Sequence, residues 1–266
     1  MFPEMQASEL QPSKRAFTLI ELLAVIAIIG VLAALLVPTL VSGQRQARKT
    51  ACLSNLHQVG LAIVAYSSDN NGAIPFGPKA GAFTSPLDFY PSTGAPTSLI
   101  SLANGAPVGL GLMLSQQLAS QKRALFCPGS DQPVDADSQL AKVGLQQAQC
   151  GYYYRHAGNT QIFDGTGSGV PLAPKLESLG NNRQGLPIRA LVTDVQFLCS
   201  PGMASFGILP STHHQGRITN VLHADGHALS LQNADQRFTV QLGANVNLYT
   251  AFDLILGVFE AADGQT

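Results

Sequence analysis

Charged residues are scarce in this chain. Of its 266 residues only 12% are Asp, Glu, Lys or Arg, and the formal net charge at pH 7 is −1. The basic residues are scattered and form no stripe, so the charge pattern predicts no nucleic-acid partner. The hydrophobic fraction is 45%, and the chain is long enough for one sizeable domain with its own core.

Recognisable catalytic and metal-binding motifs are also missing. The sequence has no G-x-S-x-G elbow and no ligand pair with zinc-finger or EF-hand spacing. Histidine and aspartate do gather in one region, which contains His213, His214, His223, His227 and Asp225, with Asp194 on a nearby predicted strand. A two-residue turn after Ala224 would place His223 and His227 on opposite faces of a hairpin. No cysteine has a convincing histidine base, so we predict neither catalysis nor a bound metal.

An apolar run near the N-terminus is the strongest feature that the sequence does have. Nothing between Leu22 and Val37 is ionisable, and a basic pair precedes the run. The span 16–41 is about 26 residues, or roughly 39 Å of helix, which exceeds the ~30 Å hydrocarbon core of a bilayer. Glu21 lies inside it, where a carboxylate costs about 2.5–3.5 kcal/mol. We therefore predict a membrane helix over 17–41 with a functional role for Glu21.

A cleaved secretory signal and a plain membrane anchor are the simpler alternatives. A secretory signal has an apolar region of about 7–15 residues that ends in a small-residue cleavage site. Here the run is longer and carries Glu21 near its start, while the small residue Ala16 precedes it. These differences argue against a secretory signal.

The segment Ala16-Phe17-Thr18-Leu19-Ile20-Glu21 resembles the N-terminal signal of type IV prepilins and type II secretion pseudopilins. The resemblance implies that a prepilin peptidase cleaves between Ala16 and Phe17 and N-methylates Phe17, so that residues 1–16 are a leader peptide. Ala16 stands where the family usually has glycine. Other (pseudo)pilin subunits, an inner-membrane assembly platform and membrane lipid are the further partners that the resemblance implies.

The same resemblance supplies a partner for Glu21, namely the free amine of Phe17 on a neighbouring subunit. That pairing would neutralise two charges in lipid and fix the axial offset between subunits. The alternative is a protonated Glu21 that reaches towards the headgroups. Basic residues flank both ends of the apolar run, so they do not decide its orientation. The resemblance places the N-terminus in the bacterial cytoplasm, the helix in the inner membrane and the head in the periplasm.

A second helical half should follow within residues 42–72. Apolar residues recur there at spacings of four and three, at Cys52, Leu56, Val59, Ile63 and Tyr66. That period predicts an amphipathic helix over about 42–68 that lays one face on the head. Pro38 should kink or loosen the helix, and the sequence 69–72 (Asp-Asn-Asn-Gly) should end it. The stretch 52–60 also resembles the C-x-x-N-L-x-Q-x-G segment of bacterial prepilin-like proteins.

The fold class is therefore α+β and pilin-like, with a long N-terminal helix packed on an antiparallel sheet in a head over 73–266. Residues 73–109 look irregular, 110–120 look like a short helix, and 131–149 look like a surface connection. We predict strands over 123–127, 151–155, 187–198 and 237–242, a hairpin over 218–231, and a helix over 248–259.

Asp225 and Gly226 suit a two-residue type I′ hairpin turn. In that register Leu222 faces Leu229, and both share the core face with Leu231. The region resembles the His-x9-Asp-Gly element of prepilin-like proteins, although ten residues separate His214 from Asp225. We expect Asp225 and Gly226 to shape the turn and His214 to hydrogen-bond near it.

The chain has four cysteines, which would lie outside the cytoplasm and allow three pairings. Cys127 and Cys150 bracket the polar connection, so we favour a disulfide between them and expect Cys52 to stay a free thiol. Some pseudopilins carry calcium in a C-terminal loop, but the acidic residues here are too sparse to assign ligands.

These features favour a structural, non-enzymatic role. The chain would be a processed prepilin subunit of a type II secretion pseudopilus or of a type IV pilus-like filament. The alternative function is an envelope-anchored binding protein that uses the prepilin route without polymerising.

Overall fold

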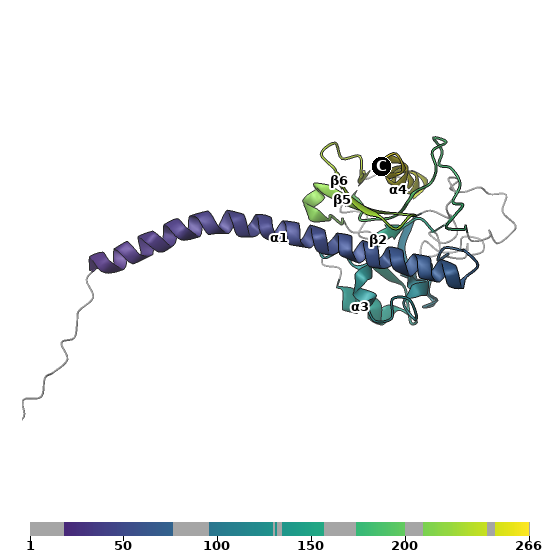
Figure 1. Ribbon diagram of the computed structural model, residues 1–266, viewed down its shortest axis with the longest axis horizontal. Coiled ribbons are helices and arrows are strands. Elements are labelled where there is room, and N and C mark those ends of the chain that lie inside the picture. The colour runs from purple at the N-terminus through teal and green to yellow at the C-terminus, as the bar shows by residue number, and fades with distance from the viewer. Residues whose placement is uncertain are drawn as a thin grey trace, which may run out of the picture. The chain divides into compact units, whose positions relative to one another are not determined.

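The computed structural model describes residues 19–76, 96–129, 131, 135–156, 174–199, 210–243 and 248–265 (Figure 1). The chain divides into two compact units, Met1–Gln44 and Arg45–Thr266. The first unit contains the N-terminal part of helix α1 (Leu19–Asp69), and the second contains the rest of α1 together with the head.

Helix α1 runs without a break through both predicted halves. Pro38 lies inside it, so the helix does not end at the proline. It ends at Asp69, after which Asn71 and Gly72 have φ angles of 54° and 82°. The Gly72 N–H donates to the Ser67 carbonyl at 2.8 Å, which satisfies one of the free carbonyls of the last turn. The predicted C-terminal stop is therefore confirmed.

The head is built on a five-stranded antiparallel sheet in the order β1-β2-β3-β5-β6. Its strands are β1 (Thr97–Ser101), β2 (Ala148–Tyr154), β3 (Ala190–Thr193), β5 (Ile218–His223) and β6 (Ala228–Gln232). A separate pair, β4 (Gln196–Cys199) and β7 (Thr239–Leu242), is parallel. The α+β prediction is confirmed, but the strand predicted over 187–198 is divided between the two sheets. Its first half, β3, occupies the central position of the large sheet.

The described part of the head also contains helices. They are η2 (Gly109–Met113), η3 (Lys122–Leu125), α3 (Ala136–Lys142), η5 (His214–Gly216) and α4 (Leu248–Asp263). The strand predicted over 123–127 is wrong, because η3 occupies most of that segment. A short apolar run does not distinguish a strand from a helical turn by periodicity alone. The predicted surface connection contains α3, which begins where the Asp135 side chain accepts a hydrogen bond from the Ser138 N–H at 2.7 Å.

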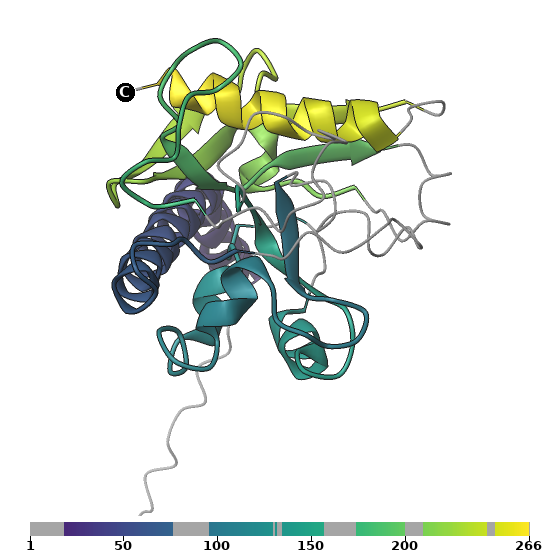
Figure 2. The same cartoon turned by 90° about the vertical axis from the view of Figure 1, so that its right-hand side faces the viewer.

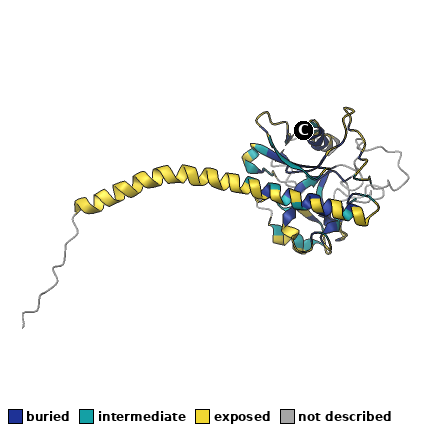
Figure 3. Ribbon diagram, viewed as in Figure 1, coloured by how far each residue is buried: buried dark blue, intermediate teal, exposed yellow. Residues whose placement is uncertain are grey.

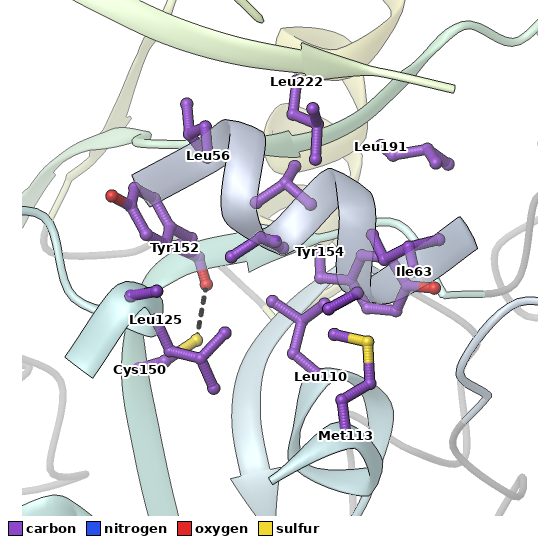
Figure 4. Close-up of a cluster of buried hydrophobic side chains, with 14 of the residues drawn as sticks. Leu56, Ile63, Leu110, Met113, Leu125, Cys150, Tyr152, Tyr154, Leu191 and Leu222 are labelled. Atoms are coloured by element: carbon purple, nitrogen blue, oxygen red, sulfur yellow. Dashed lines mark hydrogen bonds between the residues drawn. The ribbon is translucent and has the colours of Figure 1, made fainter. Parts of the chain in front are cut away.

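The large sheet has a hydrophobic core on each face. On one face the head portion of α1 packs against β2, β3 and β5, and α4 covers the other face (Figure 2). The predicted α1 stripe supplies Cys52, Leu56, Val59 and Ile63 to the first core, each no more than 1% exposed. Figure 4 shows Leu56 and Ile63 among residues from the sheet and from η2. The predicted amphipathic half is therefore confirmed.

The hairpin between β5 and β6 differs in register from the prediction. Leu222 pairs with Ala228 and Val221 pairs with Leu229, which is one residue away from the expected pairing. The Gly226 N–H donates to the His223 carbonyl at 3.0 Å, so the loop contains three residues, and Gly226 has a φ of 88°. Such a loop needs positive φ at its last residue only, unlike a type I′ turn. The shift places Leu229 opposite Val221 and on the other face from Leu222.

Candidate functional site

The N-terminal part of α1 is exposed along its described length (Figure 3), and many of its exposed side chains are large and apolar. Leu19, Ile29 and Leu36 are each more than half exposed, and none of the most apolar window of this helix is buried in the structure. Among the described residues, α1 is the one helix that is long and apolar enough to cross a membrane. Residues 19–41 alone give roughly 34 Å of helix, which matches the ~30 Å hydrocarbon thickness.

Glu21 lies in the first turn of α1 and is exposed. Acidic groups are favourable there because the helix N-terminus carries partial positive charge. Ala16 and Phe17, the two residues of the predicted cleavage site, lie outside the described residues, as does the predicted leader 1–16. Cleavage and methylation therefore stay predictions from sequence.

The C-x-x-N-L-x-Q-x-G stretch attaches α1 to the head. The Asn55 amide donates to the Phe126 carbonyl at 3.0 Å, and Leu56 is fully buried. Gly60 allows a close approach to the sheet, since a Cβ there would lie 2.9 Å from Leu222 Cδ1. Cys52, the first residue of the stretch, points into a group of polar side chains.

Four potential metal ligands meet at this point. Cys52, Cys127, Asp194 and His214 each offer one donor atom, and all four atoms lie within 4.8 Å of one another. His214 Nε2 is 3.4 Å from Cys127 Sγ and 3.4 Å from Asp194 Oδ2. Cys52 Sγ is 3.6 Å from Asp194 Oδ2. No local pattern in the sequence predicts this cluster, because Cys52 and Asp194 are 142 positions apart in the chain.

Different elements bring these side chains together. Cys52 comes from α1, Cys127 follows η3, Asp194 lies between β3 and β4, and His214 begins η5. His214 is held in a left-handed conformation, with φ of 50°, and its N–H donates to the Gly129 carbonyl at 2.7 Å. A side chain at Gly129 would collide with the imidazole, since a Cβ there would lie 2.2 Å from His214 Cε1.

Neighbouring polar groups orient the cluster. The Asn220 backbone N–H donates to Asp194 Oδ1 at 2.6 Å, and its side-chain amide donates to Oδ2 at 2.8 Å. The same amide nitrogen lies 2.8 Å from His214 Nε2. The Tyr152 hydroxyl lies 3.3 Å from Cys52 Sγ. Cys52, Asp194 and Tyr152 are all fully buried, so the cluster lies in the interior of the head.

The pKa values in the cluster are shifted by these contacts. A hydrogen bond with Cys127 lowers the pKa of Cys52 despite its burial, whereas burial raises the pKa of Cys127. Burial opposes a charge on His214, but its contacts with Asp194 and Cys52 outweigh that effect and raise its pKa to about 9. Burial raises the pKa of Tyr152 well above its usual value. Of the two thiols, Cys52 is the one that ionises first.

A cysteine, a histidine and an aspartate also form catalytic triads, but this arrangement differs from one. A triad uses one ring nitrogen as the base and the other for the orienting carboxylate. Here a single nitrogen, His214 Nε2, faces both Cys127 and Asp194. Both thiols are at most 6% exposed, which leaves them inaccessible to a substrate. The geometry is that of donors converging on one point.

Two predictions about this region need correction. His214 does not hydrogen-bond near the Asp225–Gly226 turn; it belongs to the buried cluster and precedes the opposite end of β5. Cys127 and Cys150 are both free thiols in the structure. Cys150 Sγ instead contacts the Tyr152 carbonyl at 3.2 Å (Figure 4), while Cys127 faces His214.

The hairpin turn holds a second group of titratable side chains. His223 Nδ1 lies 2.8 Å from His227 Nε2, and His227 Nδ1 contacts Asp225 Oδ1 at 2.5 Å. The prediction that His223 and His227 lie on opposite faces is therefore wrong, for the reason of register given above. Asp225 also accepts from the His227 N–H at 3.1 Å, so the expected role of Asp225 and Gly226 in shaping the turn agrees with the geometry.

Comparison with known proteins shows which family the N-terminal segment resembles. Residues 11–37 match the family described as "Prokaryotic N-terminal methylation motif". The resemblance to prepilins is confirmed. The segment that matches includes Ala16, Phe17 and Glu21, together with most of the apolar run.

Curated relatives agree with this result. The chain is 34% identical over 77 residues to a protein of Myxococcus xanthus named "Type IV major pilin protein PilA". The matched segment covers 29% of this chain and 35% of the pilin. It is 40% identical over 58 residues to "Type II secretion system core protein G" of Pectobacterium carotovorum, a match that covers 22% of this chain and 37% of that protein. The Escherichia coli protein of the same name is 40% identical over 67 residues, a match that covers 25% of this chain and 44% of that protein.

The chain therefore spans less than half the length of these three relatives. No solved structure matches it. The prepilin-like N-terminal helix fits a single-pass, membrane-anchored protein.

Proposed function

We propose that this chain is a structural prepilin subunit, processed by a prepilin peptidase and assembled into a type II secretion pseudopilus or a type IV pilus-like filament. One observation carries the proposal. A methylation motif over residues 11–37 overlaps an apolar helix segment whose side chains the rest of the described chain leaves exposed, and the same helix continues into a folded head.

Insertion in a membrane is the first step. The exposed leucine, isoleucine and valine side chains of residues 19–41 would each be unfavourable in water, at about 25 cal/mol for every Å² of apolar surface. A bilayer removes that cost, and the length of the segment fits a single crossing. The peptidase then acts between Ala16 and Phe17 on the cytoplasmic side of the inner membrane, and the head lies in the periplasm.

Assembly is the second step, and Glu21 directs it. Its carboxylate lies within the membrane segment, where a charge costs about 2.5–3.5 kcal/mol. The amine of a processed Phe17 on a neighbouring subunit neutralises that charge and is neutralised by it. Because such a pair forms at one axial offset only, it sets the stagger between subunits while apolar helices pack around it.

Mass spectrometry of the native N-terminus tests the processing step. We expect a chain that begins at Phe17 and carries one N-methyl group. Purified membrane protein that retains Met1 and the residues up to Ala16 would contradict the proposal.

Crosslinking tests the assembly step. A variant that carries one cysteine at Thr18 and a second at Ile20 should give ordered ladders of crosslinked subunits in membranes, because each subunit can then link to two neighbours. Glu21→Leu should still be inserted and processed but should reduce the ladder by at least about tenfold, because removing one partner leaves the other charge unpaired. Thr39→Val is the matched control in the same membrane segment, since the Thr39 hydroxyl donates to the Leu36 carbonyl of its own helix at 2.8 Å.

The two results separate the alternatives. A normal ladder from Glu21→Leu would remove the ion pair from the mechanism. A processed chain of the original sequence that gives no ladder would indicate the anchored, non-polymerising protein instead.

A further inference from the structure

We propose that Cys52, Cys127, Asp194 and His214 form a mononuclear zinc site that joins helix α1 to the head. The inference does not depend on filament assembly. It rests on the convergence of four donor atoms within 4.8 Å of one another in the interior of the head.

The separations between donors fit a tetrahedral zinc ion. With Zn–S near 2.3 Å and Zn–N or Zn–O near 2.0–2.2 Å, a tetrahedron has edges of about 3.4 Å for N···O and about 3.6 Å for S···N and S···O. The structure has 3.4 Å between His214 Nε2 and Asp194 Oδ2, and 3.4 Å between His214 Nε2 and Cys127 Sγ. Cys52 Sγ and Asp194 Oδ2 are 3.6 Å apart. These three separations match the tetrahedron and the other three are at most 4.8 Å, so small movements would bring all four donors around one ion.

The kinds of donor select the metal. Two thiolates bind soft or borderline ions and disfavour Ca²⁺ and Mg²⁺, which take oxygen ligands. Imidazole and carboxylate are ordinary zinc ligands, and a set with both sulfur and nitrogen in tetrahedral geometry is typical of Zn²⁺. The zinc proposal therefore differs from the sequence-based prediction of no bound metal, because its four ligands come from distant parts of the chain.

The surroundings are those of a structural site. Structural zinc has four protein ligands, whereas catalytic zinc keeps one position open for water or substrate. Here four protein donors are present, and the side chains of His214 and Asp194 are 6% and 0% exposed. The Asn220 amide donates to Asp194 Oδ2, and the Tyr152 hydroxyl lies 3.3 Å from Cys52 Sγ, as second-shell groups do when they orient ligands. The Asn220 amide nitrogen also lies 2.8 Å from His214 Nε2, so zinc binding requires this amide to leave the imidazole lone pair and keep its bond to Asp194.

A disulfide between Cys52 and Cys127 is the competing use of the two thiols. It would account for the two sulfur atoms alone. Asp194 and His214 would then pair only with each other, at 3.4 Å, and with Asn220, and a disulfide gives no role to their convergence on the two sulfur atoms. A zinc ion uses all four groups, and it excludes the disulfide because it requires both thiolates.

Metal analysis of the full-length chain, purified in detergent, tests the proposal. We expect about one zinc per chain by elemental mass spectrometry. After removal of zinc with a chelator, CoCl₂ should produce the visible bands of tetrahedral cobalt together with a thiolate-to-cobalt charge-transfer band, and ZnCl₂ should abolish both. The chelated protein should also unfold at a lower temperature, because metal binding contributes to folding.

Variants assign the ligands. Cys127→Ser and His214→Gln should each lower zinc affinity by at least about tenfold. His214→Cys retains four donors and should keep zinc, with a stronger charge-transfer band in the cobalt form. Cys150→Ser and His227→Gln are the matched controls, a buried thiol and a clustered histidine outside the four, and both should bind zinc normally. Circular dichroism establishes that each variant is folded.

Two results would overturn the proposal. One is folded original protein that, after incubation with ZnCl₂, holds no more than about a tenth of a zinc per chain and gives no cobalt bands. The other is a native, unreduced protein whose peptides carry a disulfide between Cys52 and Cys127. Because zinc content is measured on the purified chain, neither result bears on filament assembly, and failure to assemble does not bear on zinc.

Discussion

His223 and His227 face each other across the β5–β6 hairpin, with ring centres 4.3 Å apart and His223 Nδ1 2.8 Å from His227 Nε2. The His223 N–H also donates to the His227 carbonyl at 2.9 Å. His223 is buried, and burial together with the nearby His227 lowers its pKa to about 4. The remaining charged groups that act on it are Asp225, Asp263 and Arg189.

The lowered pKa of His223 predicts a loss of stability in mild acid. An unfolded histidine takes up its proton near pH 6.5, whereas native His223 stays neutral until about pH 4. The stabilising contribution is thus present above pH 6.5 and is lost as the pH falls from 6.5 to 4. His223→Gln should reduce the slope of the unfolding free energy against pH in that window, by an amount that corresponds to the uptake of up to about one proton on unfolding.

Urea unfolding at several pH values measures this dependence. Leu61→Gln, at a residue that is 73% exposed and does not titrate, is the control and should retain the slope of the original protein. An unchanged slope in His223→Gln would show that His223 does not stay neutral in the native state.

Gly60 should not tolerate a larger residue, because it lies against the sheet. A Cβ there would be 2.9 Å from Leu222 Cδ1 and 3.7 Å from Gly226 Cα. Gly60→Val should lower the free energy of unfolding of the head by about 1–3 kcal/mol, as expected for overpacking. Gly43→Val is the control in the same helix, since nothing lies within 4 Å of a Cβ there. Equal effects at the two glycines would contradict the close packing of α1 on β5.

Leu56 should be the main apolar contact between α1 and the head. It is fully buried, whereas Leu61 on the same helix is 73% exposed. Leu56→Ala should cost about 2–5 kcal/mol of unfolding free energy through lost transfer energy and a residual cavity. Leu61→Ala should have little effect in the same urea titration, and a similar loss from both would mean that α1 does not bury the face described above.

Asp263 holds the end of α4 against the sheet through a buried ion pair. Its Oδ2 accepts from Arg155 Nη1 at 2.9 Å, and its Oδ1 accepts from the Arg189 and Ala190 N–H groups at 2.8 and 2.9 Å. Asp263→Ala should lower the unfolding free energy by about 3–5 kcal/mol, because Arg155 would remain buried without its partner.

The control for that pair is the exposed one between Arg123 and Asp137. Asp137→Ala should change the urea midpoint very little, since solvent screens exposed pairs. If Asp263→Ala had as small an effect, the ion pair would not be what anchors α4.

Local patterns predicted a large part of the fold. The spacing of Cys52, Leu56, Val59 and Ile63 identified the buried face of α1, because a helix returns to the same face every three or four residues. The residues after Asp69 predicted the helix end, and the apolar runs predicted β2, β5, β6 and α4 at about the right positions. The prepilin-like N-terminus was also readable from sequence, since the motif is continuous.

Register and strand pairing were less predictable. A two-residue and a three-residue loop both suit the sequence Ala224-Asp225-Gly226, and the choice between them moves every side chain of β6 to the other face. The bond from the Ala224 N–H to the Arg189 carbonyl, at 2.7 Å, belongs to the neighbouring segment of the chain. Contacts of that kind help to determine the loop and lie outside any local pattern.

By itself, the sequence of this protein determined the apolar helix, its single acidic residue, the helix face that meets the head and the kinds of element that follow. These properties depend on neighbours along the chain or one helical turn apart. Only the tertiary structure decided that Cys52 meets Asp194, 142 positions away, and that His214 joins them rather than the hairpin turn. Such contacts depend on how the sheet packs against α1, and that packing is set by the whole core at once.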